Sequence, residues 1–158
     1  MTTRAFVHGL EGSSQGTKSR FFRKRYPDMI IEDYTGSLEE RMDKLRRILA
    51  GEEDLVLVGS SYGGLMAAMY ALEDESVIKR LILLAPALDL EEFVPYRSRK
   101  IAVPTILFHG RRDDVVPLGP VREVATRVFT DLKHYIVDDD HPLSGTFSSI
   151  DWDALLAD

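Results

Sequence analysis

The sequence has no cysteine among its 158 residues, and it has no excess of basic side chains. The first absence excludes disulfides, cysteine nucleophiles and thiolate metal sites. The 20 lysines and arginines stand against 26 aspartates and glutamates, which gives a formal net charge of −6. Because general nucleic-acid binding needs a basic surface to contact phosphates, we do not expect nucleic acid as a partner.

Long apolar runs are also missing. The opening residues, Met1 to Arg4, lead directly into a short apolar segment and lack the basic stretch and long apolar core of a signal peptide. No apolar run approaches the roughly 20 residues that a membrane-spanning helix needs. We therefore expect a cytoplasmic protein with no membrane partner.

What remains is the composition of an ordinary globular protein, with 44% hydrophobic and 29% charged residues. The length suits one domain over residues 1–158, which is large enough to bury a sizeable core. No internal repeat, low-complexity segment or interdomain linker interrupts the chain.

Short apolar runs alternate along the chain with segments of helical spacing. The runs are continuous, as is typical of strands that are covered on both faces. This alternation of strands and helices predicts an α/β fold with three layers, α/β/α, around a mostly parallel six-stranded sheet. Ser37 and Glu40 form a capping-box pattern ahead of one helix. The expected strands are 5–7, 29–31, 55–58, 81–84, 105–108 and 133–137, and the expected helices are 17–26, 38–49, 62–73, 121–129 and 150–156.

The pentapeptide GSSYG, residues 59–63, lies between an expected strand and an expected helix. Strand, Gly-x-Ser-x-Gly and helix together are typical of a serine nucleophile on a sharp turn. The turn requires glycines because larger side chains on either side of Ser61 would collide with it, while Ser61 itself takes a strained backbone conformation. We therefore predict that Ser61 is a nucleophile and that Ser60 is only its neighbour in the turn.

Two further motifs follow other strands, at the edge of the sheet where parallel α/β folds bind ligands. HGRRDDVVP, residues 109–117, follows the fifth expected strand, and Asp140-His141 follows the sixth. A histidine can accept the proton of a serine hydroxyl, and a carboxylate can orient that histidine. His141 is the preferred base, because His134 lies at the start of a strand and therefore at the other end of the sheet. His8 and His109 each precede a glycine at a strand end, and we expect them to pack or to form hydrogen bonds near the site.

The chain order of serine, aspartate and histidine resembles that of the α/β-hydrolase superfamily. The resemblance runs over nearly the whole chain, from His8-Gly9 to His141, and is strongest to small, lidless bacterial esterase-like hydrolases. It implies that Ser61 is the nucleophile, Asp113 the acid and His141 the base. Asp114 and Asp89 are rivals for the acid, and the His-Gly-x-x-Asp register of the family favours Asp113.

The same resemblance implies an oxyanion hole made by the backbone N–H groups of Leu10 and Tyr62, and it implies no metal and no organic cofactor. The sequence lacks the early antiparallel strands and the cap domain of larger members. The irregular stretch from Ala87 to Lys100 is where a lid would be inserted. We therefore expect a minimal, open α/β-hydrolase fold without a cap.

These features predict a carboxylesterase that acts on small, soluble acyl esters through an acyl-enzyme. A thioesterase, or an amidase or peptidase, would use the same three residues. A non-catalytic binding or scaffold protein on the same fold is the alternative from another class.

Several charged residues lie close to these motifs. Glu11, Arg111 and Arg112 are candidate substrate contacts, although the two arginines could simply pair with Asp138 and its neighbours. The acidic run before His141 could suggest a metal site, but we expect a solvated loop because no second ligand cluster accompanies it. A basic cluster on the first expected helix is interpreted as a solvated helix face, with a membrane-surface role as the lesser alternative. That cluster comprises Lys18, Arg20, Arg23, Lys24 and Arg25.

Overall fold

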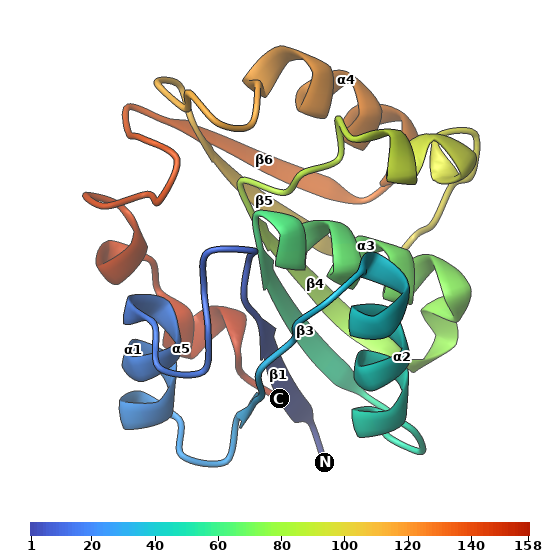
Figure 1. The fold of residues 1–158 in the computed structure, drawn as a ribbon, viewed down its shortest axis with the longest axis vertical. Helices are drawn as coiled ribbons and strands as arrows, with labels where there is room; N and C mark the ends of the chain where they lie inside the picture. The colour runs from blue at the N-terminus through green and yellow to red at the C-terminus, as the bar shows by residue number, and fades with distance from the viewer.

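One six-stranded sheet organises the chain in the computed structural model, which describes residues 1–158 (Figure 1). The strands lie in the order β2-β1-β3-β4-β5-β6, and all neighbouring pairs are parallel. The predicted α/β fold is therefore confirmed, with a sheet that is wholly rather than mostly parallel. The strands are β1 (Thr3–Val7), β2 (Ile30–Ile31), β3 (Leu55–Ser60), β4 (Ile78–Leu84), β5 (Thr105–Gly110) and β6 (Leu132–Val137).

Helices cover both faces of the sheet (Figure 1). The larger core lies under α2, α3 and α4, and the smaller one lies under α1 and α5. None of the helices combines the length and the apolar character needed to cross a membrane. The helices are α1 (Thr17–Arg25), α2 (Leu38–Ile48), α3 (Tyr62–Glu73), α4 (Leu118–Val128) and α5 (Trp152–Leu155), with 3₁₀ helices η1 (Glu75–Val77), η2 (Glu91–Tyr96) and η3 (Phe147–Ser149).

The central strand β3 shows why its sequence is apolar at every position. Leu55 and Leu57 face the larger core, whereas Val56 and Val58 face the smaller one. Successive side chains of a strand point to opposite faces, so a strand with helices on both sides buries all of them. The helix that follows, α3, is also buried along nearly all of its length, because it packs directly on the sheet.

Aromatic side chains join the two ends of the chain in the smaller core. Phe22, on α1, is fully buried, and its ring centroid lies 4.8 Å from that of Trp152 on α5. The ring centroids of Phe6 and Phe147 lie 5.0 and 5.4 Å from the ring centroid of Phe22. These contacts fix α1 against the C-terminal segment, and that position matters for the site described below.

The far edge of the sheet departs from the prediction that all strands are covered on both faces. β6 is an edge strand, and Lys133 and Tyr135 are exposed on one of its faces. The terminal helix is also shorter than predicted, because the segment 150–156 forms only the single turn of α5. The irregular stretch 87–100 contains η2 and no cap or lid domain.

Ser37→Ala is expected to lower the free energy of unfolding by about 1 kcal/mol. The Ser37 hydroxyl accepts a hydrogen bond from the Glu40 backbone N–H at 3.1 Å, and the Glu40 carboxylate accepts one from the Ser37 backbone N–H at 3.1 Å. Urea unfolding measures the change. Ser148→Ala is the matched control, because Ser148 is exposed and its hydroxyl forms no hydrogen bond within the chain. Equal losses in the two variants would contradict the assigned role of the cap.

Candidate active site

Ser61 joins the carboxyl end of β3 to the start of α3. Its backbone has φ 57° and ψ −117°, a conformation that residues other than glycine rarely adopt. Hydrogen bonds within α3, to the end of β4 and to the segment after β4 hold it there. The Ser61 N–H donates to the Leu84 carbonyl at 2.8 Å, and the Ala87 N–H donates to the Ser61 carbonyl at 3.0 Å. The strained turn raises the hydroxyl above the edge of the sheet.

The two glycines of the pentapeptide are needed for close packing. A Cβ at Gly63 would lie 2.1 Å from the Val7 carbonyl oxygen, and one at Gly59 would lie 2.4 Å from the Gly63 oxygen. No side chain can occupy either position without moving α3 away from the sheet. The pattern Gly-x-Ser-x-Gly thus reflects how closely β1, β3 and α3 approach one another at the turn.

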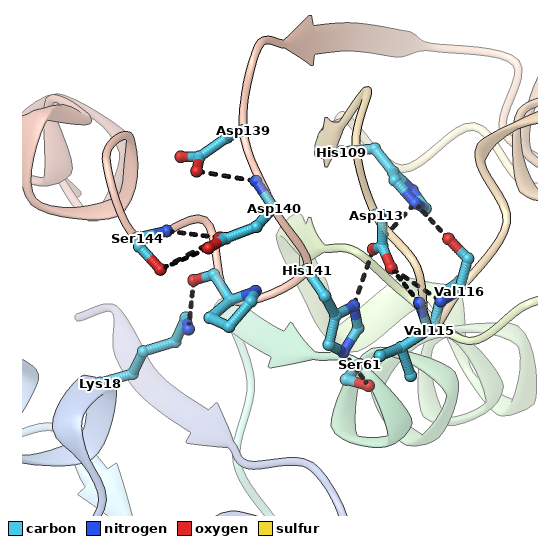
Figure 2. A network of polar contacts seen from close by, with 11 residues as sticks. Lys18, Ser61, His109, Asp113, Val115, Val116, Asp139, Asp140, His141 and Ser144 are labelled. Carbon is cyan, nitrogen blue, oxygen red and sulfur yellow. Dashed lines mark hydrogen bonds and ion pairs between the residues drawn. The ribbon is translucent and has the colours of Figure 1, made fainter.

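Three side chains from separate loops meet at this turn (Figure 2). His141 Nε2 lies 3.0 Å from Ser61 Oγ, and His141 Nδ1 lies 2.7 Å from Asp113 Oδ2. The side chain of Asp113 is fully enclosed, whereas that of His141 is 17% exposed. The structure therefore brings together the three residues that the sequence singled out, in the order serine, histidine, aspartate.

The Asp113 carboxylate is held by more than His141. Its Oδ1 accepts the backbone N–H groups of Val115 at 2.9 Å and Val116 at 2.8 Å. Burial disfavours the charged carboxylate, but the hydrogen bonds from His141, Val116 and Val115 outweigh it and hold the pKa of Asp113 below its ordinary value. The carboxylate is consequently ionised at neutral pH and can accept the His141 Nδ1–H.

His109 completes the surroundings of this acid. Its Nε2 lies 3.0 Å from the Val116 carbonyl oxygen and 3.2 Å from Asp113 Oδ2. Because a carbonyl oxygen can only accept, Nε2 carries the hydrogen of the ring. His109 is fully buried and supports the Asp113 loop, which agrees with the expectation that it forms hydrogen bonds near the site.

The rival residues lie outside this arrangement. Neither Asp114 nor Asp89 contacts His141, and Asp114 is exposed. His134 lies on β6 and does not contact Ser61. His8 has both ring nitrogens engaged, because Nε2 accepts the Tyr34 N–H at 2.9 Å and Nδ1 lies 2.6 Å from the Gly9 carbonyl oxygen.

The loop after β1 supplies the surroundings expected of an oxyanion hole. A Cβ at Gly9 would lie 3.2 Å from Ser61 Cβ and 3.7 Å from the Tyr62 nitrogen, so this loop packs against the turn. Tyr62 begins α3, and Leu10 follows Gly9 directly. The assignment of the Leu10 and Tyr62 N–H groups as oxyanion donors remains a prediction.

A cavity of about 550 Å³ opens beside Ser61. Its walls come from the loop after β1, the first turn of α1 and the loop that carries His141. Leu10 and Val115 line it with side chains that are 57% and 65% exposed. A ligand in this cavity would therefore touch the hydroxyl of Ser61, the ring of His141 and two apolar groups.

The family model that matches this sequence is that of the alpha/beta hydrolase fold, and it matches residues 8–98. The chain belongs to this family. The match covers more than half of the sequence and includes the loop after β1 and the Ser61 turn. No curated relative matches the chain.

Solved structures with the same fold include several hydrolases. The CIB-like hydrolase of Thermoplasma acidophilum is 24% identical, with a TM-score of 0.77 over 98% of this chain and 86% of its own. Est1E of Butyrivibrio proteoclasticus is 16% identical, with a TM-score of 0.80 over 98% of this chain and 85% of its own. The monoacylglycerol lipase of Paleococcus ferrophilus is 16% identical, with a TM-score of 0.75 over 97% and 93%. At these identities the likeness shows the fold of this α/β-hydrolase.

Of the charged candidates for substrate contact, only Glu11 lines the cavity of this α/β-hydrolase. Arg112 Nε instead pairs with Asp138 Oδ1 at 3.0 Å, and both side chains are exposed. Arg111 is exposed on the same loop and does not line the cavity. The structure thus favours the simpler interpretation of Arg112, which is pairing with the acidic run.

The acidic run itself is not the uniformly solvated loop that the sequence suggested. Asp139 is only 5% exposed, and it accepts the backbone N–H groups of Asp140 at 2.8 Å and Gly145 at 3.0 Å. Asp140 accepts from the Ser144 hydroxyl and N–H (Figure 2). These carboxylates shape the loop around His141, and no group of three or more potential ligands is placed to hold a metal ion.

Lys18 is the residue of the site that the sequence analysis missed. It was assigned to a solvated helix face, but it is half-buried, lines the cavity and donates from Nζ to the Pro142 carbonyl at 2.7 Å (Figure 2). The signal available in the sequence was its position in the first turn after the loop that follows the first strand. The fold places that turn at the edge of the sheet where the Ser61 turn also lies.

Gly110→Ala is expected to slow the reaction of Ser61 by about 100-fold, because misplacement of a catalytic group by about 1 Å has an effect of this size. A Cβ at Gly110 would lie 2.4 Å from the Asp139 oxygen and 2.5 Å from the Asp140 oxygen. The loops that carry Asp113 and His141 must then move apart. The rate of labelling by a fluorophosphonate measures the effect.

Gly119→Ala is the matched control, because nothing lies within 4 Å of a Cβ at that position. Circular dichroism and urea unfolding distinguish a misaligned site from an unfolded chain. A Gly110→Ala protein that is folded and labels at the normal rate would contradict this account of how the two loops are positioned.

Proposed function

We propose that this α/β-hydrolase is a serine hydrolase that cleaves carboxylic esters of small, soluble acyl groups through an acyl-enzyme. The observation that carries the proposal is the position of the His141 ring, with one nitrogen 3.0 Å from Ser61 Oγ and the other 2.7 Å from Asp113 Oδ2. A serine hydroxyl is a weak nucleophile until a base removes its proton, and this arrangement provides the base.

The chemistry follows from what each group can do. Ser61 Oγ attacks the ester carbonyl carbon while His141 Nε2 accepts the hydroxyl proton. Asp113 accepts the Nδ1–H, which fixes the tautomer of the ring and stabilises the imidazolium. The protonated His141 then donates its Nε2 proton to the leaving alcohol. Water, activated by the same nitrogen, hydrolyses the acyl-enzyme and regenerates Ser61.

The negative charge that develops on the substrate oxygen requires hydrogen-bond donors. The N–H groups of Tyr62 and Leu10 are proposed for this role, because the Gly9 loop packs directly against the Ser61 turn. Loss of one such donor typically raises the barrier by about 3 to 4 kcal/mol. The proposed reaction uses no cofactor.

Two features support a small substrate. The cavity has a volume of about 550 Å³, and the segment 87–100 adds only η2 and no cap above it. The apolar side chains of Leu10 and Val115 at the cavity suit the hydrocarbon part of an ester. The monoacylglycerol lipase among the structural neighbours shows that the fold supports ester hydrolysis in another protein.

Ser61→Ala is expected to abolish labelling by a fluorophosphonate probe and to lower kcat for ester hydrolysis by a factor on the order of a million. The variant lacks the nucleophilic oxygen but keeps the strained turn. Ser60→Ala is the matched control, since the Ser60 hydroxyl forms no hydrogen bond with His141, and it should keep the labelling. Wild-type protein that neither reacts with the probe nor hydrolyses any ester would support a non-catalytic scaffold instead.

Matched oxygen esters, thioesters and amides of one acyl group should separate the remaining alternatives. We expect the largest kcat/KM for the oxygen ester. An amine is a poorer leaving group than an alcohol, and His141 is the proton donor that lies within hydrogen-bond distance of Ser61 Oγ. A larger kcat/KM for the thioester or the amide would replace the carboxylesterase assignment with a thioesterase or an amidase.

A further inference from the structure

The Lys18 ammonium shares the cavity with the Ser61 hydroxyl. Lys18 lies in the first turn of α1, and its side chain runs along the cavity wall to the loop that carries His141 (Figure 2). Its Nζ reaches the carbonyl of Pro142, the residue directly after His141, at 2.7 Å. The lysine nitrogen also lies 5.3 Å from the centre of the Phe147 ring. A cationic group is thus held in the cavity that Ser61 and His141 also line.

This cation has no counter-ion in contact. None of the ion pairs in the structure includes Lys18. The nearby carboxylates of Asp139 and Asp140 act only at longer range, and their oxygens already accept hydrogen bonds from their own loop. An ammonium group has three N–H bonds, and Pro142 takes one of them.

Burial makes the lack of a contacting partner costly. Withdrawal from water lowers the pKa of Lys18, and the charges of Asp140 and Asp139 oppose this only in part. A charge that is partly removed from water is stabilised by an ion pair or by hydrogen bonds from an anion. The first turn of α1 carries no acidic residue, and Glu11, the one carboxylate that lines the cavity, is exposed and unpaired. The missing partner can therefore come from a ligand.

We propose that the ester substrate carries a carboxylate and that Lys18 binds it. The inference rests on the proposed function, because it places the carboxylate and the scissile ester in the same cavity. It makes Lys18 a specificity-determining residue. Arg111 and Arg112 do not take this role, because neither lines the cavity.

The test compares esters that differ only in charge. One pair is the monomethyl ester of adipic acid and its carboxamide analogue, which place the group on the acyl side. The other pair is 4-acetoxybutanoate and its carboxamide, which place it on the alcohol side. We expect the wild-type protein to prefer the carboxylate in at least one pair by about tenfold in kcat/KM, as a charge-assisted hydrogen bond provides.

Lys18→Gln should remove this preference, and Lys18→Arg should keep most of it. Lys24→Gln is the control, because Lys24 is exposed on the same helix and does not line the cavity. Since Lys18 also bonds to Pro142, its loss can slow all substrates, so the ratio within each pair is the measured quantity. Unfolding by urea shows that each variant is folded.

Two results would overturn the inference while leaving the serine hydrolase intact. One is a wild-type protein that hydrolyses carboxylate and carboxamide esters at equal rates in both pairs. The other is a Lys18→Gln variant that slows the two members of each pair equally, which would make Lys18 only a support for the His141 loop. Failure to hydrolyse any ester, together with failure to react with a fluorophosphonate, would instead refute the proposed function and the inference with it.

Discussion

The close approach of Gly63 to the carbonyl of Val7 sets the geometry of the turn that carries Ser61. A Cβ at Gly63 would lie 2.1 Å from that oxygen, so α3 approaches β1 as closely as backbone allows. This approach leaves Ser61 at φ 57°, with its hydroxyl clear of the sheet. The strain is maintained because bonds to Leu84 and Ala87 hold the turn from both sides. The conformation of Ser61 therefore depends on the packing of α3 against β1.

A second close approach places the other two groups. Gly110 ends β5 and lies against the carbonyls of Asp139 and Asp140, so the loop that carries Asp113 and the loop that carries His141 are in backbone contact. Parallel pairing of β5 and β6 brings both loops to the same edge of the sheet. The histidine ring therefore needs only a short reach to bridge the carboxylate and the serine.

The elements that local sequence determines were predictable, and those that depend on distant packing were not. Continuous apolar runs located the strands from β1 to β5, because a strand that is covered on both faces is apolar at nearly every position. The same signal failed at β6, where the sheet ends and Tyr135 faces solvent. The residues next to Asp139 and Lys18 in the sequence did not predict that these two side chains would be withdrawn from water. Lys18 contacts a carbonyl more than a hundred residues away in the chain, and Asp139 is enclosed by its own loop and by Gly110 of β5.

In the proposed mechanism, Lys18 connects the choice of substrate to the proposed base, His141. The same nitrogen that is proposed to bind a carboxylate donates to the carbonyl of Pro142, the neighbour of His141, which is the proposed base for Ser61. An anion bound at Lys18 polarises that ammonium and so alters the hydrogen bond to Pro142. A carboxylate bound to Lys18 would then alter the position of the loop that carries His141. Neutral esters of equal size fill the cavity without this coupling, so selectivity for charge would arise in kcat as well as in KM.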